Sequence, residues 1–475
     1  MISLRSIFAL FGLTLLFWAC TDTLEEEVFS ELTPATFLNT EDGIRSLLNS
    51  AYASAQYQSF DGHVAYHYLP SMTSGLTWNV GGSIEVFFTA LTEFSWDSNH
   101  RYIAGLYNES FAAIRDANIV LDNIDNEDFS AEFRSLTTAE ARFIRGWSYS
   151  MLYNNFGPVT LYTNSSTDSL LIPRSSEAEM QAFIENELTF AADNLPVTPE
   201  QYGRASKGAA LAVLCKYYLN TRQWQAVVDV SQQIMDLGIY GLVDDYRSVF
   251  ALANEGNEEM LWVLPRTAPV AGQNINALSF PTDYPLPYPG SSVFAARTYF
   301  FDEFVDSFED TDTRKDILVT EYTNTSGVHV QLYGFDQSLS LKYEFDPASA
   351  GATTGNDIPA IRYADIVLAR AEALNELNGP TQASIDLINE VRNRAHASSL
   401  SLGGFSKESL REAILKERKW EFFMEGKERE DQVRQGVFIS MAQERGKPAQ
   451  PHHVLFPIPL VDIQANPAIQ QNQGY

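Results

Sequence analysis

The chain has 475 residues, of which 45% are hydrophobic, so it is long enough for two or three ordinary domains or for one large helical one. It carries 32 Lys and Arg against 61 Asp and Glu, a formal net charge of −29. This charge excludes nucleic acid as a partner, because phosphate binding requires clustered basic residues. Aromatic residues make up 12% of the chain, a content that suits carbohydrate stacking surfaces and core packing alike.

Residues 1–19 have the layout of a lipoprotein signal peptide. Met1 to Arg5 form a short basic segment, and the apolar run 7–18 that follows is too short to span a bilayer as a helix. It ends at Ala19-Cys20, and the acidic spacer 21–27 comes next. The sequence therefore predicts cleavage before Cys20 and lipidation of this residue. The alternative is an ordinary secretory signal followed by a coincidental cysteine.

Helical periodicity covers much of the remaining chain. The segments 205–220 and 224–237 form a predicted αα-hairpin of about 34 residues, the length of a tetratricopeptide unit. The segments 363–377 and 381–395 form a second one. Alanines at 364, 369, 371 and 373 allow the close helix approach that a solenoid of hairpins requires. Further helices are predicted at 40–57, 99–124, 137–156, 176–195 and 301–308.

Two stretches, 58–96 and 237–358, lose this periodicity and gain Gly, Ser, Pro, Tyr and Trp. We expect long irregular connections here apart from a strand at 260–264, and such loops are usually functional. Sugar rings stack on exposed aromatic faces, and their hydroxyls bond to neighbouring amides and carboxylates. On this basis the candidate ligand-binding residues are Trp78, Asn79, Tyr284, Tyr288, Tyr66 and Trp96.

The run from Leu410 to Gly436 is unusually polar for a segment rich in aromatics. Glu417, Glu421 and Glu425 share one helical face, where like charges repel unless cations lie nearby. The cations available within the run are Arg418, Arg429 and Arg434. We expect a partly buried and mutually paired set of charges that serves the architecture, because an unpaired buried carboxylate is costly.

This run resembles the closing helix of the SusD-like (RagB/SusD) family, glycan-capturing outer-membrane lipoproteins. The matching residues are Ile414, Glu417, Arg418, Glu421, Glu425, Gly426, Asp431 and Arg434. The family is also matched by Arg362-Tyr363-Ala364-Asp365 and by a tail that runs from Pro457-Ile458-Pro459 through Asn466-Pro467 to Gly474-Tyr475. The resemblance extends from Cys20 to the end of the chain.

The resemblance implies a mostly α fold, an α/α superhelix of tetratricopeptide-like hairpins with long irregular loops and a few short strands. It implies one domain at 20–475, divided into a helical part 20–236, a loop-rich insertion 237–358, and C-terminal hairpins and tail 359–475. It also implies a surface-exposed lipoprotein of the outer membrane that binds oligosaccharides without cleaving them. The expected partner is a TonB-dependent, SusC-like transporter, and no cofactor is expected.

The sequence contains none of the catalytic or cofactor-binding motifs that were sought: H-E-x-x-H, G-x-S-x-G, a phosphate-binding glycine loop and C-x-x-C. The pair His452-His453 predicts a solvated loop and no metal site, and Cys215 predicts a buried, inert thiol. Two alternative functions stay open. One is peptide import by a protein of the same family. The other is glycoside hydrolysis, for which acidic pairs such as Glu258/Glu259 would have to flank one bond.

Overall fold

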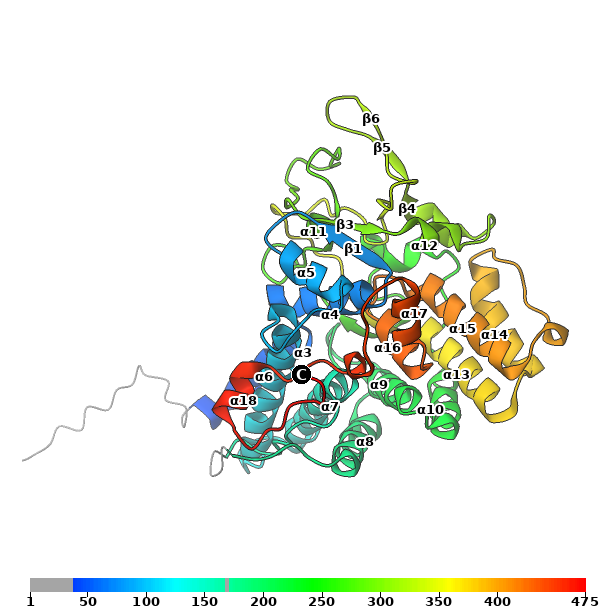
Figure 1. Ribbon diagram of the computed structural model, residues 1–475. Coiled ribbons are helices and arrows are strands. Elements are labelled where there is room, and N and C mark those ends of the chain that lie inside the picture. Colours follow the sequence, from blue (N-terminus) through cyan, green and yellow to red (C-terminus); the bar gives the residue numbers. More distant parts are fainter. Residues whose placement is uncertain (1–36, 167–170) are drawn as a thin grey trace, which may run out of the picture.

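The computed structural model describes residues 37–166 and 171–475, and helices dominate it (Figure 1). Since Cys20 lies outside the described residues, the expected lipidation site has no structural description. The longer helices are α3 (Glu41–Ala55), α4 (Phe60–Thr73), α5 (Glu85–Thr92), α6 (Arg101–Asn123), α7 (Ala131–Phe156), α8 (Glu177–Asn194), α9 (Lys207–Asn220), α10 (Trp224–Asp236), α13 (Tyr363–Asn378), α14 (Gln382–Arg394) and α15 (Lys407–Phe422). The shorter ones are α11 (Ile275–Ser279), α12 (Asp302–Asp306), α16 (Glu428–Arg434), α17 (Phe438–Glu444) and α18 (Leu460–Ala465).

The long helices form a row in which each packs against the next. α6 contacts α7, α7 contacts α8, and the row continues through α9 and α10 to α13 and α14. Both predicted hairpins are confirmed, and they stack through α10 and α13. Ala364, Ala369, Ala371 and Ala373 are fully buried, which fits the close approach expected of them. The predicted α/α superhelical fold is therefore confirmed.

The prediction of an irregular segment at 58–96 is wrong for most of its length. It folds into α4, a short strand and α5, and Ser59 caps α4 by accepting a hydrogen bond from the Gly62 amide. Nearly all of α4 is buried, from Gly62 to Leu69 without a break. A helix that is surrounded by protein needs no polar face, so it lacks the amphipathic period by which helices are recognised.

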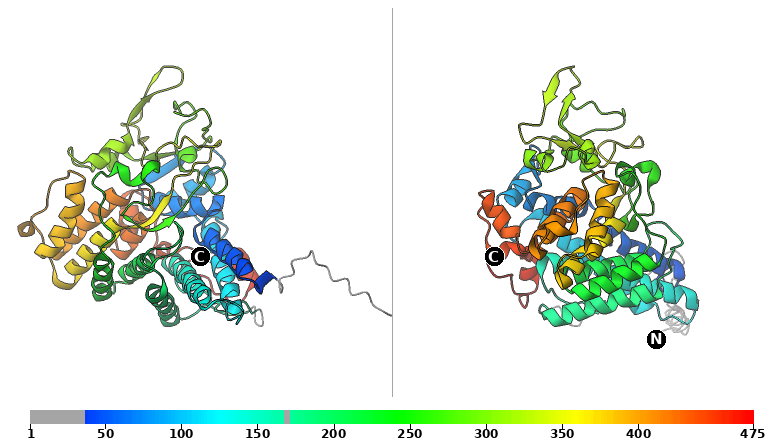
Figure 2. Two further views of the ribbon diagram at one scale, coloured as in Figure 1. Left: turned by 180° about the vertical axis from the view of Figure 1, so that it is seen from behind. Right: turned by 90° about the vertical axis from the view of Figure 1, so that its right-hand side faces the viewer.

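Short strands and loops gather on one side of the helical row, where all three ribbon views place them (Figures 1 and 2). We call residues 275–345, together with strand β1, the cap. Its strands are β1 (Thr77–Val80), β3 (Arg297–Phe300), β4 (Leu318–Val319), β5 (Glu321–Thr323), β6 (His329–Gln331) and β7 (Leu339–Ser340). They pair antiparallel as β1–β3, β4–β7 and β5–β6. The predicted strand at 260–264 is β2 (Met260–Leu264), which pairs outside the cap with β8 (Ile358–Arg362).

The polar run after Leu410 lies in the core, as expected. Glu417, Glu421 and Glu425 are at most 1% exposed. Their counter-ions come from elsewhere in the chain: Arg314, Lys342, Arg362, Arg392 and Arg394. The expected pairing with Arg418, Arg429 and Arg434 is therefore wrong. Successive residues on a helix point about 100° apart, so Arg418 cannot share a face with Glu417.

The three arginines of the run have other partners. Arg418 binds Asp365 and Asp431 at 2.7 and 2.8 Å, and Arg434 binds Glu372. Arg429 donates to the backbone carbonyl groups of His453 and Val454. The ion pairs of Arg418 with Asp365 and of Arg434 with Glu372 thus fasten the C-terminal helices to α13, more than fifty residues away in the sequence.

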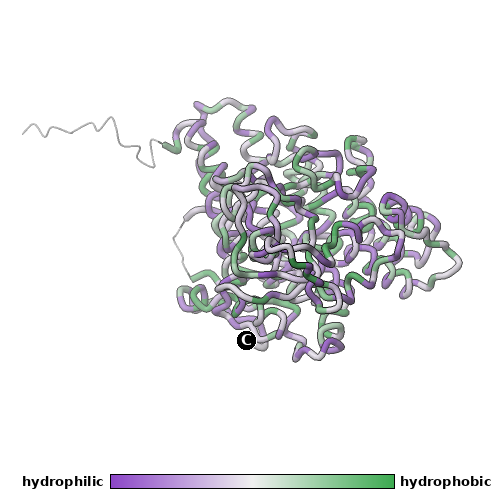
Figure 3. The backbone as a smooth tube through the Cα atoms, turned by 90° about the horizontal axis from the view of Figure 1, so that it is seen from above, coloured by the Kyte–Doolittle hydropathy of each residue, from purple (hydrophilic) through white to green (hydrophobic). Residues whose placement is uncertain are grey.

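Hydrophilic and hydrophobic segments alternate along the described part of the tube (Figure 3). Within residues 37–166 and 171–475, no helix combines the length and the apolar character that a membrane span requires. Cys215 is fully buried, and this burial raises the pKa of its thiol to about 12, as expected for an inert cysteine.

Candidate functional site

The cap contains an apolar cluster of its own, separate from the main core. Strand pairing places Trp78 of β1 opposite Tyr299 of β3, with their ring centroids 5.6 Å apart. Tyr284 packs against the same cluster, and its ring lies 4.7 Å from Phe280 and 5.0 Å from Tyr322. The two stretches that were expected to supply the binding face therefore meet in one place.

Trp78 differs from the expected loop tryptophan. It lies in a strand and is half-buried, and its indole N–H donates to the Asp336 carbonyl oxygen at 2.6 Å. Asn79 is only 7% exposed, and its amide donates to the Arg297 carbonyl oxygen at 2.8 Å across the β1–β3 pair. The amide of Asn79 therefore joins strands and is not presented to a ligand.

Tyr66 and Trp96 are both buried, so neither presents the exposed aromatic face that was expected of it. Tyr66 lies within α4 and is 4% exposed. Trp96 is equally buried, and its indole N–H donates to the Tyr475 hydroxyl oxygen at 2.8 Å. Its ring centroid lies 4.7 Å from that of His453, which is 5% exposed, so this histidine lies in the core and not in the solvated loop that was expected.

The remaining candidates lie on the Pro-rich segment of the cap. Tyr284 and Tyr288 are both half-buried. Beside Tyr284, the Asp283 carboxylate accepts from the Tyr322 hydroxyl at 2.7 Å and from the Asn324 amide at 3.1 Å. The hydrogen bond from Tyr322 is the main cause that lowers the pKa of Asp283. Asp283 therefore stays ionised and fixes β5 against the Pro-rich segment.

A turn at 333–336 carries the most exposed aromatic rings of the described cap, and sequence reasoning missed it. Phe335 is 65% exposed and Tyr333 is 40% exposed. The Asp302 carboxylate holds the turn by accepting from the amides of Gly334 and Asp336 at 2.8 and 3.2 Å. The sequence Tyr333-Gly334-Phe335, in which two aromatic residues flank a glycine, could have predicted an exposed aromatic turn here.

Of the acidic pair Glu258/Glu259 considered for hydrolysis, Glu259 is held in buried ion pairs. The Glu259 carboxylate binds the guanidinium groups of Arg362 and Arg394. Among the described residues, no cluster of three or more His, Cys, Asp and Glu side chains has the arrangement of a metal site. What the cap offers is an aromatic surface with fixed polar neighbours, the arrangement expected of a binding protein.

A row of helical hairpins that carries an aromatic cap on one side defines the class of this molecule. Residues 340–475 match the model of the SusD family, and residues 22–219 match a family model described as starch-binding and associating with the outer membrane. SusD-like protein P25 of Formosa agariphila is 27% identical over 96% of this chain and 97% of its own. The starch-binding protein SusD of Bacteroides thetaiotaomicron is 24% identical over 81% of each chain.

Solved structures agree in fold. A SusD homologue from Bacteroides thetaiotaomicron superimposes with a TM-score of 0.82 at 22% identity, over 93% of this chain and 99% of its own. A laminarin-binding SusD-like protein superimposes with a TM-score of 0.78, also at 22% identity, over 91% and 99%. The chain belongs to the SusD-like family, as its C-terminal motifs predict.

Proposed function

We propose that this protein captures oligosaccharides or polysaccharides on its cap and passes them uncut to a TonB-dependent, SusC-like transporter in the outer membrane. The observation that carries the proposal is the convergence of aromatic residues on one side of the helical row. Trp78 and Tyr284 meet in the cap cluster, and the 333–336 turn accepts the Trp78 indole hydrogen bond while exposing Phe335.

The chemistry of this surface suits a sugar chain. The C–H face of a pyranose ring packs against an aromatic ring, and its hydroxyls bond to carboxylates and amides. Around the turn, Asp302, Asp306 and Asp336 supply such acceptors. A shallow surface leaves much of a polymer in water, so affinity is modest and release is easy.

Two further parts of the proposal concern location. Lipidation at Cys20 would anchor the chain in the outer membrane, and the acidic spacer after it supports exposure to the exterior. The helical side, opposite the cap, would dock on the transporter barrel. Support comes from the family, since a starch-binding member is among the relatives and one matching model is described as associating with the outer membrane.

The test uses Phe335→Ala, with Leu377→Ala as its matched control. Both side chains are exposed, at 65% and 43%, but Leu377 ends α13, a helix outside the cap. Losing one stacked ring costs about 1 kcal/mol, so we expect a fall in affinity of about fivefold for Phe335→Ala on a glycan array. Both variants should keep their melting temperature, because neither side chain is in the core.

Three results would count against the proposal. Equal affinity for Phe335→Ala and the control would remove the cap as the glycan surface. Preferential capture from a peptide library would support peptide import in its place. Release of reducing ends from a bound polysaccharide would overturn the non-catalytic assignment.

A further inference from the structure

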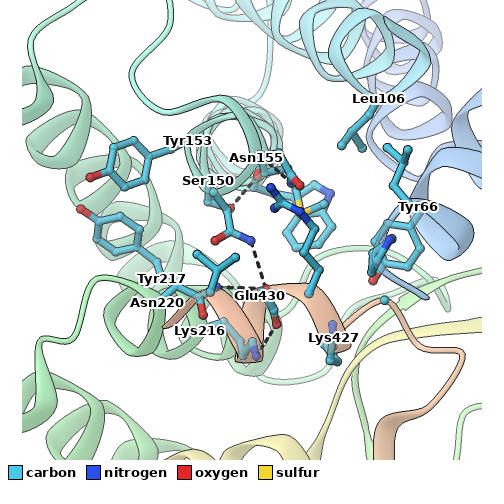
Figure 4. Close-up of a pocket in the computed structure, with 18 of the residues that line it drawn as sticks. Tyr66, Leu106, Ser150, Tyr153, Asn155, Lys216, Tyr217, Asn220, Lys427 and Glu430 are labelled. Carbon is cyan, nitrogen blue, oxygen red and sulfur yellow. Dashed lines mark hydrogen bonds and ion pairs between the residues drawn. The ribbon is translucent and has the colours of Figure 1, made fainter. Parts of the chain in front are cut away.

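A cavity of about 360 Å³ lies inside the helical body, and its wall contains no residue of the cap. Helices α4, α7, α9 and α16 surround it, and Figure 4 shows side chains from them pointing inward. Its volume is in the range of small-molecule sites. Half-buried residues such as Asn154 and Thr221 at its edge connect it with solvent.

Two buried cations line this cavity without a carboxylate partner. Lys427 is 6% exposed and Arg429 is 3% exposed, and within the described residues neither forms an ion pair with Asp or Glu. The Lys427 ammonium donates to the Ala360 carbonyl oxygen, and Arg429 donates to two backbone carbonyl groups. Burial lowers the pKa of Arg429 to about 10, a cost that a nearby anion would relieve.

Glu430 and Lys216 form an ion pair in the wall and neutralise each other. Glu430 binds the Lys216 ammonium at 2.6 Å and accepts from the amides of Asn154 and Asn220 at 3.2 and 3.0 Å (Figure 4). Its carboxylate therefore does not compensate Lys427 or Arg429. The Lys427 charge also helps to lower the pKa of Asp365, but that carboxylate already binds Arg418 and Lys216. Lys427 and Arg429 therefore have no carboxylate in direct contact, which favours an anionic ligand on this wall.

Hydroxyl-bonding and apolar groups complete the wall. The hydroxyl of Tyr66 is buried and has no hydrogen-bond partner among the described residues, and Tyr66 lies on the same side of the cavity as Lys427 (Figure 4). Leu106, Val213 and Leu455 contribute apolar surface to the wall. A buried hydroxyl without a partner costs free energy unless a bound molecule satisfies it.

We propose that this cavity binds a small hydroxylated carboxylic acid of the size of one uronic acid. Its carboxylate would lie between Lys427 and Arg429, one of its hydroxyls would bond to Tyr66, and its C–H face would pack on Leu106 and Leu455. This site is distinct from the cap and stands whether or not the cap binds glycan.

The test compares two ligands that share a ring and differ in charge, sodium glucuronate and glucose, by calorimetric titration of the full mature chain. A charge-assisted hydrogen bond contributes enough for about tenfold in affinity, so we expect glucuronate to bind at one site at least about tenfold more tightly than glucose. Lys427→Gln should remove most of this preference while keeping a donor for the Ala360 carbonyl group.

Two further variants fix the location. Ser150→Phe places a ring in the cavity and leaves every charge in place, since the Ser150 hydroxyl donates only to the Trp147 carbonyl oxygen. It should abolish glucuronate binding. Phe335→Ala in the cap should leave glucuronate binding unchanged, whatever it does to polysaccharide binding.

Each contrary result has a defined meaning. Equal binding of glucose and glucuronate would refute the role of the two cations. Glucuronate binding that survives Ser150→Phe would refute the cavity as its place, and binding lost in Phe335→Ala would assign it to the cap. Absence of saturable binding to the folded wild-type chain would mean that the cavity holds only water.

Discussion

Replacing Glu421 with Gln is the sharpest test of how the helical body is held together. The Glu421 carboxylate accepts from Arg362 Nη1 at 3.0 Å, from Arg314 Nη1 at 3.1 Å and from Arg394. Gln has nearly the same shape, but it carries no charge and turns an N–H₂ group toward these guanidinium groups. The substitution therefore removes the charge while leaving the packing in place.

The magnitude follows from the charge balance around this residue. In the described structure, five buried cations meet five fully buried carboxylates, and Glu309 joins them at the protein edge. Removing one carboxylate leaves a buried positive charge uncompensated, which costs about 3–5 kcal/mol. We expect the free energy of unfolding to fall by that amount in urea titrations at neutral pH.

Glu93→Gln is the matched control. Glu93 pairs with Lys447 at 2.7 Å, but its side chain is 49% exposed, and a surface pair of this kind contributes about 0–1 kcal/mol. If Glu421→Gln costs no more than Glu93→Gln, the buried ion pairs do not stabilise the body and the reasoning fails.

Acid titration gives a second reading of the same variant. Burial alone would raise the pKa of Glu421, but Arg394, Arg362 and Arg314 outweigh it and hold the pKa well below the usual 4.5. A lowered folded-state pKa contributes stability that is present above the unfolded value and lost as pH falls below it. The stability difference between wild type and Glu421→Gln should therefore shrink below about pH 4.5. A difference that stays constant down to the acid transition would contradict this assignment.

Three further predictions concern other residues. Burial and the Arg266 charge lower the pKa of His63 to about 3, so the free energy of unfolding should fall as pH falls from 6.5 toward 3. In urea titrations, His63→Gln should make this dependence on pH less steep, and an unchanged dependence would contradict the assignment. Cys215 should stay unmodified by a thiol reagent in a folded Cys20→Ala chain and react fully in urea, whereas rapid labelling of the folded chain would refute its burial. Cys20→Ala itself should shift the protein from the membrane fraction to the soluble fraction, and if it still sediments with membranes, lipidation is not the anchor.

The sequence predicted which two aromatic stretches come together more accurately than it predicted the contacts of their individual residues. The two aromatic stretches do meet, and Trp78 and Tyr284 share one cluster. Tyr66 was misplaced because α4 is buried on nearly every side and so has no hydrophobic period to reveal it. Trp96 was misplaced because its partner, the Tyr475 hydroxyl, lies 379 residues away, and composition carries no information about such pairing.

The ion pairs of the core show the same limit. The dense charges of α15 predicted that counter-ions must lie nearby, because a buried carboxylate without a partner costs too much free energy. Which cations they are depends on how distant segments pack: Arg314 and Arg362 reach Glu421 from 107 and 59 residues away. Local spacing favoured Arg418 because it is near in sequence, although it points to another side of the helix.

The hydrogen bonds around the 333–336 turn have a kinetic consequence. The Asp302 carboxylate and the Trp78 indole both form hydrogen bonds with the backbone of the turn. The backbone that carries the Phe335 ring is therefore ordered before a ligand binds. Under the proposed function, binding of a sugar chain would therefore require little further ordering of the turn and no slow rearrangement. Dissociation of the sugar would be limited only by its contacts with a few aromatic rings. Under the proposed function, in which the ligand passes to a transporter, this arrangement would favour release, because a sugar chain enclosed by a loop that folds around it would dissociate slowly.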